Sequence, residues 1–128
     1  MVILLTADKA IHQLQLEFSR RYPFLRLEFF KPANRELAGE TEISPFTLLK
    51  SACLSREGEL VIENNNSVKQ LEKVFEQEFG LCVHVSRRSG LLWLHTSLTN
   101  NWTLEKQNEQ GREISLAVNP YPGKAAGK

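Results

Sequence analysis

The sequence has no long apolar segment and no excess of charge of either sign. The N-terminal apolar run, Val2–Leu5, is four residues long, which is far shorter than the core of a signal peptide or a membrane-spanning helix. The 16 basic and 15 acidic residues give a net charge of +1, whereas proteins dedicated to DNA or anionic membranes carry a clear basic excess. These absences predict a cytoplasmic protein that does not bind membranes.

The sequence also lacks the motifs of common catalytic and cofactor sites. Its two cysteines, Cys53 and Cys82, form no C-x-x-C pair or other metal or redox spacing. Without an export signal, we expect both to be reduced thiols. There is no phosphate-binding loop, nucleophile elbow, paired-carboxylate motif or dinucleotide fingerprint. We therefore expect a protein that is not an enzyme and holds no cofactor.

What the sequence does contain is one pattern that occurs twice. Each half has four large apolar residues spaced by 3, 4 and 4, which line one face of a helix. The two sets are related by a constant offset of 57: Ile11, Leu14, Phe18 and Tyr22, against Val68, Leu71, Phe75 and Phe79. Further along, an offset of 56 places Phe46-Thr47-Leu48 on Trp102-Thr103-Leu104 and Lys50 on Lys106. A repeat of this kind sets the architecture.

The order of elements in each half is predicted to be β-α-β-β-α. An apolar strand (Val2–Leu5, Leu60–Ile62) precedes each helix, and a strand that alternates apolar and polar residues follows it (25–30, 81–86). The next strand is clear at Leu91–Thr96 and poor at Arg35–Gly39. A short helix closes each half, near Phe46–Leu54 and Trp102–Gln110.

The helix ends carry their own signals. Ser67-Val68-Lys69-Gln70 fits a capping box at the start of the second helix, and Gly80 suits a left-handed cap at its end. Thr6 or Asp8 is expected to cap the first helix, and Pro23 to end it.

Two architectures fit these elements. In the first, one α+β domain over residues 1–111 consists of two tandem repeats, about 1–56 and 57–111, with helices packed on a mixed, ferredoxin-like sheet. In the second, a single ferredoxin-like domain covers residues 2–63 and the rest elaborates it. Both assign residues 112–128, which are rich in Pro, Gly and Ala towards the end, to a disordered tail.

Reactive side chains converge in the second predicted hairpin. A two-residue loop at Ser89-Gly90 puts His84 opposite His95, and a four-residue loop puts Cys82 opposite His95 and His84 opposite Trp93. Either register leaves all four side chains on one face, because side chains alternate with period two. Cys82, His84 and His95 offer three zinc ligands. A Cys/His nucleophile is a further hypothesis, but Cys82 lies mid-strand and Cys53 is expected to pack in a helix, so structural thiols are favoured.

The same sheet face suggests binding rather than catalysis. Phe30 and Trp93 are expected to project from it near Arg26 and Arg88, an arrangement that can stack the bases of single-stranded nucleic acid. An uncovered apolar face also marks a protein interface, with a protein partner or a second copy of the chain as its occupant. We rank a protein-interaction or structural module first, a nucleic-acid binder second and a metal-binding protein third. The predicted interaction face comprises Arg26, Glu28, Phe30, His84, Arg88, Trp93 and His95.

A resemblance rests on the second half of the chain. The strand Gly58–Ile62, the helix ending at Phe79-Gly80, the hairpin and the helix start at Trp102-Thr103-Leu104 resemble small uncharacterised bacterial α+β proteins with internally repeated βαββα units. The resemblance implies the repeated fold and carries no activity.

Overall fold

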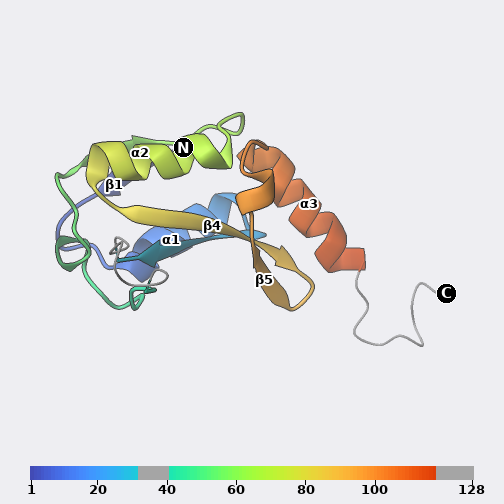
Figure 1. Ribbon diagram of the computed structural model, residues 1–128, viewed down its shortest axis with the longest axis horizontal. Helices are drawn as coiled ribbons and strands as arrows, with labels where there is room; N and C mark the ends of the chain where they lie inside the picture. The colour runs from blue at the N-terminus through green and yellow to red at the C-terminus, as the bar shows by residue number, and fades with distance from the viewer. Residues whose placement is uncertain (32–40, 118–128) are drawn as a thin grey trace.

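The computed structural model describes residues 1–31 and 41–117 (Figure 1). The chain is α+β, as the sequence predicts, with three α-helices, five β-strands and two short 3-10 helices in the described part. In chain order these are β1 (Val2–Leu5), α1 (Ile11–Arg21), β2 (Leu25–Phe30), η1 (Leu49–Ser51), β3 (Gly58–Val61), α2 (Val68–Phe79), β4 (Cys82–Ser89), β5 (Leu92–His95), η2 (Ser97–Thr99) and α3 (Leu104–Ala117). The third strand predicted for the first half, Arg35–Gly39, lies outside the described residues.

The strands form two separate antiparallel sheets, so the predicted mixed sheet is wrong. One sheet pairs β1 with β3, and the other has the order β2-β4-β5. A ferredoxin-like unit would join β1 and β2 in parallel through α1, but these two strands lie in different sheets. Each of them pairs instead with a strand from the other half, and every pairing is antiparallel.

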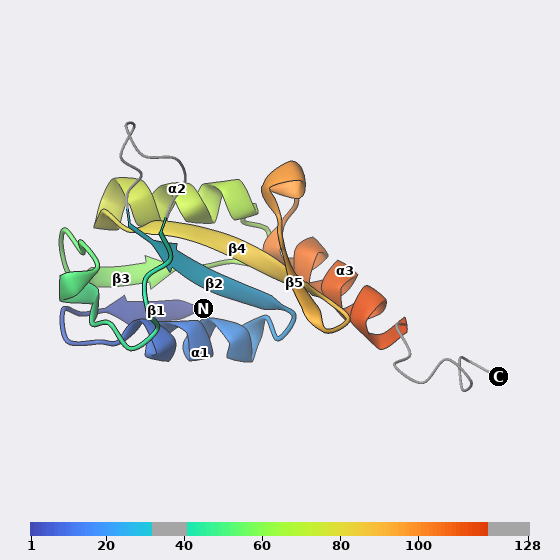
Figure 2. The same ribbon diagram turned by 60° about the horizontal axis from the view of Figure 1, so that its bottom comes forward.

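The two sheets pack face to face with the core between them. Figure 2 shows β2 and β4 crossing in front of the β1–β3 pair, with α1 on one side of that pair and α2 on the other. The apolar residues of the alternating strands point inward and are at most 2% exposed: Leu25, Leu27, Phe29, Leu81, Val83 and Val85. They meet the buried faces of α1, α2, β1 and β3. The opposite face of the β2-β4-β5 sheet therefore carries the polar residues of the alternation.

In each of the two strand pairings that join the halves, a residue lies opposite the residue that the predicted repeat assigns to it. The β1–β3 register pairs Ile3 with Leu60, at the offset of 57 seen between the helices. The β2–β4 register pairs Glu28 with His84, at an offset of 56. Each pairing thus joins one half of the chain to the other.

The predicted start and end of α2 are confirmed, whereas the predicted start of α1 is wrong. The Ser67 hydroxyl accepts a hydrogen bond from the Gln70 N–H at 3.0 Å, and the Gln70 side chain accepts one from the Ser67 N–H at 2.8 Å, which is the predicted capping box. Gly80 ends α2 with φ of 70°, and a Cβ there would lie 3.0 Å from the Cys53 carbonyl oxygen. In α1, the N-cap is Ala10 rather than Thr6 or Asp8.

The closing segments match at an offset of 55, so the predicted offset of 56 is wrong. Ile11 N–H donates to the Thr47 carbonyl at 2.9 Å, and Val68 N–H donates to the Trp102 carbonyl at 3.1 Å. The counterparts at the buried position are Leu49 and Leu104, each with no exposed surface. These two leucines set how the two closing segments align. Each side chain fills the core next to the start of a helix, and such a position favours an apolar residue. Phe46, predicted to match Trp102, is instead 80% exposed.

The two closing helices differ from the predictions in length. The first is only the 3-10 turn η1, whereas α3 continues to Ala117. Residues 112–117, predicted to be disordered, are therefore helical, and the Ser115 hydroxyl accepts a hydrogen bond from Gly90 N–H at 3.2 Å. At Gly111, an added Cβ would lie 2.9 Å from Cγ of Arg87, so the close approach of α3 to β4 requires glycine. The predicted tail beyond Ala117 lies outside the described residues.

No helix in the described part of the chain is long and apolar enough to cross a membrane.

Tyr22 provides a test of the packing between the halves. Its ring is 1% exposed, and its hydroxyl donates a hydrogen bond to Asn64 Oδ1 at 2.8 Å. Burial raises the pKa of Tyr22 above its ordinary value of 10.0, although the Arg21 charge opposes the shift. Because the unfolded chain then loses this proton first, the stabilisation is present below pH 10 and is lost as pH rises above it.

We predict that Tyr22→Phe lowers the free energy of unfolding by about 0.5 to 1.5 kcal/mol at neutral pH, through loss of one hydrogen bond. It should also flatten the decline of stability above pH 10. Urea unfolding of both proteins between pH 7 and pH 11 measures this. Parallel declines of the two proteins would contradict a raised pKa at Tyr22.

Candidate functional site

All seven residues of the predicted interaction face lie on one side of the β2-β4-β5 sheet, which we call the outer face. The register of β2 with β4 places Glu28 opposite His84, and Arg26 opposite Ser86. The register of β4 with β5 places Ser86 opposite His95. With alternation along each strand, the outer face consists of Arg26, Glu28, Phe30, Cys82, His84, Ser86, Arg88, Trp93 and His95.

The hairpin register differs from both predicted alternatives. The two-residue loop is Gly90-Leu91, since Ser89 pairs with Leu92, and Gly90 has a φ of 65°. His95 therefore lies opposite Ser86, rather than opposite His84 or Cys82. The predicted grouping on one face is still correct, because the registers differ by an even number of residues and an even shift leaves each side chain on its side.

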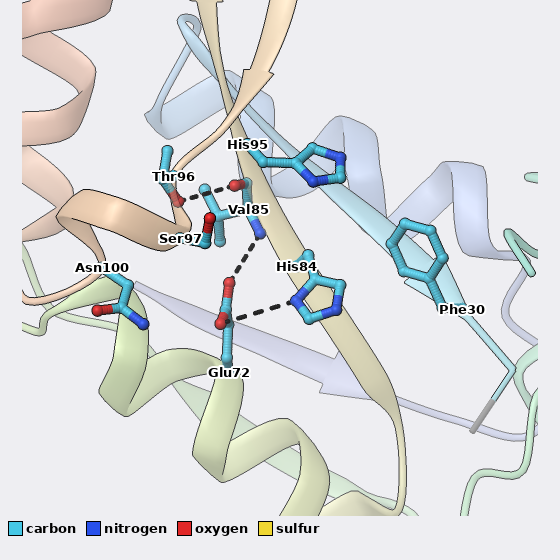
Figure 3. A pocket seen from close by; sticks show the side chains of 8 residues that line it. All are labelled: Phe30, Glu72, His84, Val85, His95, Thr96, Ser97 and Asn100. Atoms are coloured by element: carbon cyan, nitrogen blue, oxygen red, sulfur yellow. Dashed lines mark hydrogen bonds and ion pairs between the residues drawn. The ribbon is translucent and has the colours of Figure 1, made fainter. Parts of the chain in front are cut away.

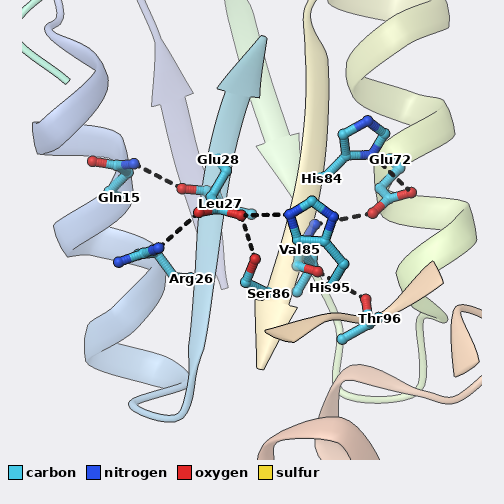
Figure 4. Close-up of polar contacts among 10 residues, drawn as sticks. All are labelled: Gln15, Arg26, Leu27, Glu28, Glu72, His84, Val85, Ser86, His95 and Thr96. Carbon is cyan, nitrogen blue, oxygen red and sulfur yellow. Dashed lines mark hydrogen bonds and ion pairs between the residues drawn. The ribbon is translucent and has the colours of Figure 1, made fainter. Parts of the chain in front are cut away.

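A buried carboxylate stands at the centre of the outer face (Figure 4). The Glu28 side chain is 8% exposed, and its Oε2 accepts a hydrogen bond from Arg26 Nη2 at 2.7 Å. Its Oε1 accepts one from the Ser86 hydroxyl and lies 3.6 Å from Nε2 of His95. The guanidinium of Arg26 also lies 4.6 Å from the ring centroid of Trp93. The carboxylate is thus held by partners from all three strands.

This order of groups does not suit nucleophilic catalysis. In a serine-based triad, the imidazole lies between the hydroxyl and the acid, so that it takes the hydroxyl proton. Here Glu28 occupies the middle position and receives the hydrogen bond from Ser86. Ser86 also has no exposed surface, so a substrate has no access to its hydroxyl.

A cavity of about 390 Å³ opens next to His84 and His95 (Figure 3), and His95 in turn lies beside Glu28. Its walls come from β2, β4, β5, α2 and the segment that follows β5: Phe30, Glu72, His84, Val85, His95, Thr96, Ser97 and Asn100. The rings of His84 and His95 are 6.4 Å apart between centroids and stacked at 28°. The Phe30 ring lies 5.1 Å from His84. Three rings and a carboxylate therefore surround a space large enough for a side chain.

Glu72, on α2, is a site residue that the sequence reasoning missed. Its Oε2 accepts a hydrogen bond from Val85 N–H at 3.0 Å, and its Oε1 lies 3.8 Å from Nδ1 of His84. The carboxylate caps the edge of β4 where the shorter β5 has ended, and Thr96 caps the carbonyl of Val85 with a hydroxyl at 2.8 Å. No signal in the sequence indicated this residue, because the two strands were predicted to be equally long. In the structure β4 is longer than β5, which leaves backbone groups of β4 to be paired by other means.

The predicted zinc ligands do not converge. Within residues 1–31 and 41–117, no group of three His, Cys, Asp or Glu side chains is placed to hold a metal ion. Cys82 lies opposite Phe30 at one end of β4, whereas His95 lies opposite Ser86 further along. The other thiol, Cys53, is not packed in a helix as predicted, but is exposed, with a φ of 73°, after η1.

In comparisons with protein-family models, curated proteins and solved structures, nothing matched the chain. The resemblance to small bacterial repeat proteins therefore stays a prediction.

The buried contact between Glu28 and Ser86 predicts strong energetic coupling. Glu28→Ala and Ser86→Ala should each lower the free energy of unfolding by about 1 to 3 kcal/mol, because each leaves a buried polar partner without its hydrogen bond. The double variant should lose less unfolding free energy than the two single variants lose together, and the difference should be about 0.5 to 3 kcal/mol. Urea unfolding of the four proteins measures the coupling.

Glu59→Ala is the control, because Glu59 is exposed on β3 and its loss should change stability by less than about 0.5 kcal/mol. Additive effects of the two single variants would contradict the coupling.

Proposed function

We propose that the protein is a non-enzymatic binding module, and that its outer face receives a protein partner whose basic side chain enters the cavity beside Glu28. The observation that carries this proposal is the charge of the cavity. Glu72 lines it, Glu28 lies next to it, and none of the described residues that line it is a lysine or arginine.

The cavity has the chemistry that an arginine needs. The Glu72 carboxylate is partly exposed, at 22%, so it retains acceptor capacity beyond its bond to Val85. A guanidinium binds carboxylates with paired, charge-assisted hydrogen bonds and stacks on flat rings. Phe30, His84 and His95 supply those rings. Arginine and aromatic residues are also the usual anchors of protein interfaces.

The same charges disfavour single-stranded nucleic acid, the second candidate. Phosphates would meet the carboxylates of Glu28 and Glu72, and binding to nucleic acid depends on unpaired cations. Arg26 already binds Glu28, and Arg88 Nε donates to the Gly90 carbonyl at 2.8 Å. The stacked pair of Arg26 and Trp93 is the feature that favours base stacking.

We also propose that the two halves are tandem copies of one unit, in which the binding site belongs to the second copy. Gln15 is the counterpart of Glu72 at the offset of 57. Its amide nitrogen donates to the Leu27 carbonyl at 2.7 Å, so it caps the edge of β2 as Glu72 caps the edge of β4. The capping role is shared, whereas the negative charge occurs only at Glu72.

We predict that Glu72→Gln weakens partner binding by about tenfold or more, since it removes a charge-assisted hydrogen bond while its side-chain carbonyl can still accept from Val85 N–H. Trp93→Ala should weaken binding as well. The measurement is affinity purification from the native host with and without nuclease, followed by titration of the recovered partner against each variant.

Glu59→Gln makes the same charge change on an exposed strand of the other sheet and should bind normally. Recovery that disappears after nuclease treatment would overturn the proposal in favour of nucleic acid. A partner that binds Glu72→Gln as tightly as the original chain would overturn the role of the cavity.

A further inference from the structure

The β2-β4-β5 sheet has one edge that the described part of the molecule leaves uncovered. At the β2 edge, Gln15 and Ser19 donate to the Leu27 and Leu25 carbonyls at 2.7 and 3.1 Å, and Ile43 N–H donates to the Phe29 carbonyl at 2.7 Å. Beyond the end of β5, β4 is capped by Glu72 and Thr96. The remaining edge is β5, whose only neighbour among the described strands is β4.

The backbone groups at this edge point away from the sheet. Arg88 N–H donates to the Phe24 carbonyl at 2.9 Å, so the backbone of Arg88 faces β2. In an antiparallel ladder, the residue opposite then faces outward, which is Trp93. By alternation, His95 faces outward too. Among the described residues, no hydrogen bond engages the backbone N–H or C=O of Trp93 or His95.

This edge also lacks the features that keep edge strands apart. Natural edges carry charged residues, prolines or bulges that block pairing. The segment Leu91–Thr96 has no charged residue and no proline. Its leucines are exposed instead: Leu91 83%, Leu92 66% and Leu94 44%. An exposed apolar edge of this kind favours addition of another strand.

We propose that β5 pairs antiparallel with β5 of a second copy of the chain, with Leu94 opposite Leu94. In this register, the N–H and C=O of Trp93 bond to the C=O and N–H of His95 in the second copy, and the reverse pair does the same. All outward groups of both edges are then satisfied. Trp93 meets His95 on the outer face, and no like charges meet.

A second copy of the chain is the favoured occupant because the β5 edge of one chain complements the β5 edge of another. Every outward donor finds an acceptor at the same spacing on an identical strand, and the twofold axis closes the assembly at two chains. Leu92 and Leu94 lie on the side of the sheet opposite to the outer face, so Leu94 can be substituted without changing a residue of the proposed binding site. The pairing would place the two outer faces next to each other on one continuous sheet.

The test is the mass of the full chain in solution as a function of concentration. Sedimentation and light scattering should show a mass twice that of the 14.6 kDa chain at high concentration, with a dissociation constant of about 10 to 100 µM for so small an interface. Leu94→Lys puts two ammonium groups opposite each other and should abolish the doubling. An equimolar mixture of Leu94→Lys and Leu94→Glu should restore it.

Leu16→Lys is the matched control, since Leu16 is 57% exposed on α1, and it should associate as the original chain does. A second measurement needs no variant: amide hydrogen exchange at Trp93 and His95 should slow as protein concentration rises. A chain that stays monomeric at about 300 µM, an L94K variant that still doubles its mass, or a mixture that does not associate would each overturn the proposal. The proposed function is tested apart from this, because Leu94→Lys leaves Glu72 and the cavity unchanged.

Discussion

The antiparallel pairing of β2 with β4 is the interaction on which the rest of the structure depends. It joins the two halves of the chain and sets Glu28 opposite His84. With that register, the apolar members of both strands fall on the inner side, where they are buried against α1, α2 and the β1–β3 sheet. The polar members necessarily fall together on the outer side. One pairing therefore creates both the core and the candidate site.

The outer face shows how a polar surface becomes a defined site. A buried carboxylate is costly unless hydrogen bonds hold it, and Glu28 receives them from Arg26 and Ser86. Arg26 in turn lies over Trp93, so the groups fix one another in position. The cavity beside them is bounded by Glu72, which α2 supplies across the edge of β4. Its negative charge comes from elements far apart in the sequence.

The edges of the β2-β4-β5 sheet account for the positions of several polar side chains that lie outside the apolar core. A strand edge exposes N–H and C=O groups that need hydrogen bonds. Gln15 and Ser19 meet this need along β2, and Glu72 and Thr96 meet it along β4. In the second half, one of these caps is ionised, and it also lines the cavity. The site thus combines a structural requirement of the sheet with a carboxylate, where the first half has the amide of Gln15.

The sequence by itself determined α1 and α2, their buried faces and the side of the sheet on which each strand residue lies. Helical spacing identifies the face of α1 and α2, and period two assigns Arg26, His84 and Trp93 to one side whichever even register the hairpin adopts. The capping box at Ser67 is likewise a local signal. Local periodicity is enough for these features because neighbouring residues decide them.

Only the tertiary structure decided which strands pair, the register of the closing segments and the residues that complete the site. Periodicity describes one strand and does not name its partner, so a mixed sheet and two antiparallel sheets fit the same pattern. The segment Thr47-Leu48-Leu49 has two leucines that could fill the one core position of the first closing segment. In the structure Leu49 occupies it. Glu72 joined the site because α2 lies against the edge of β4. The physical reason is common to all three: contacts between distant segments depend on packing of the whole chain, which local pattern does not encode.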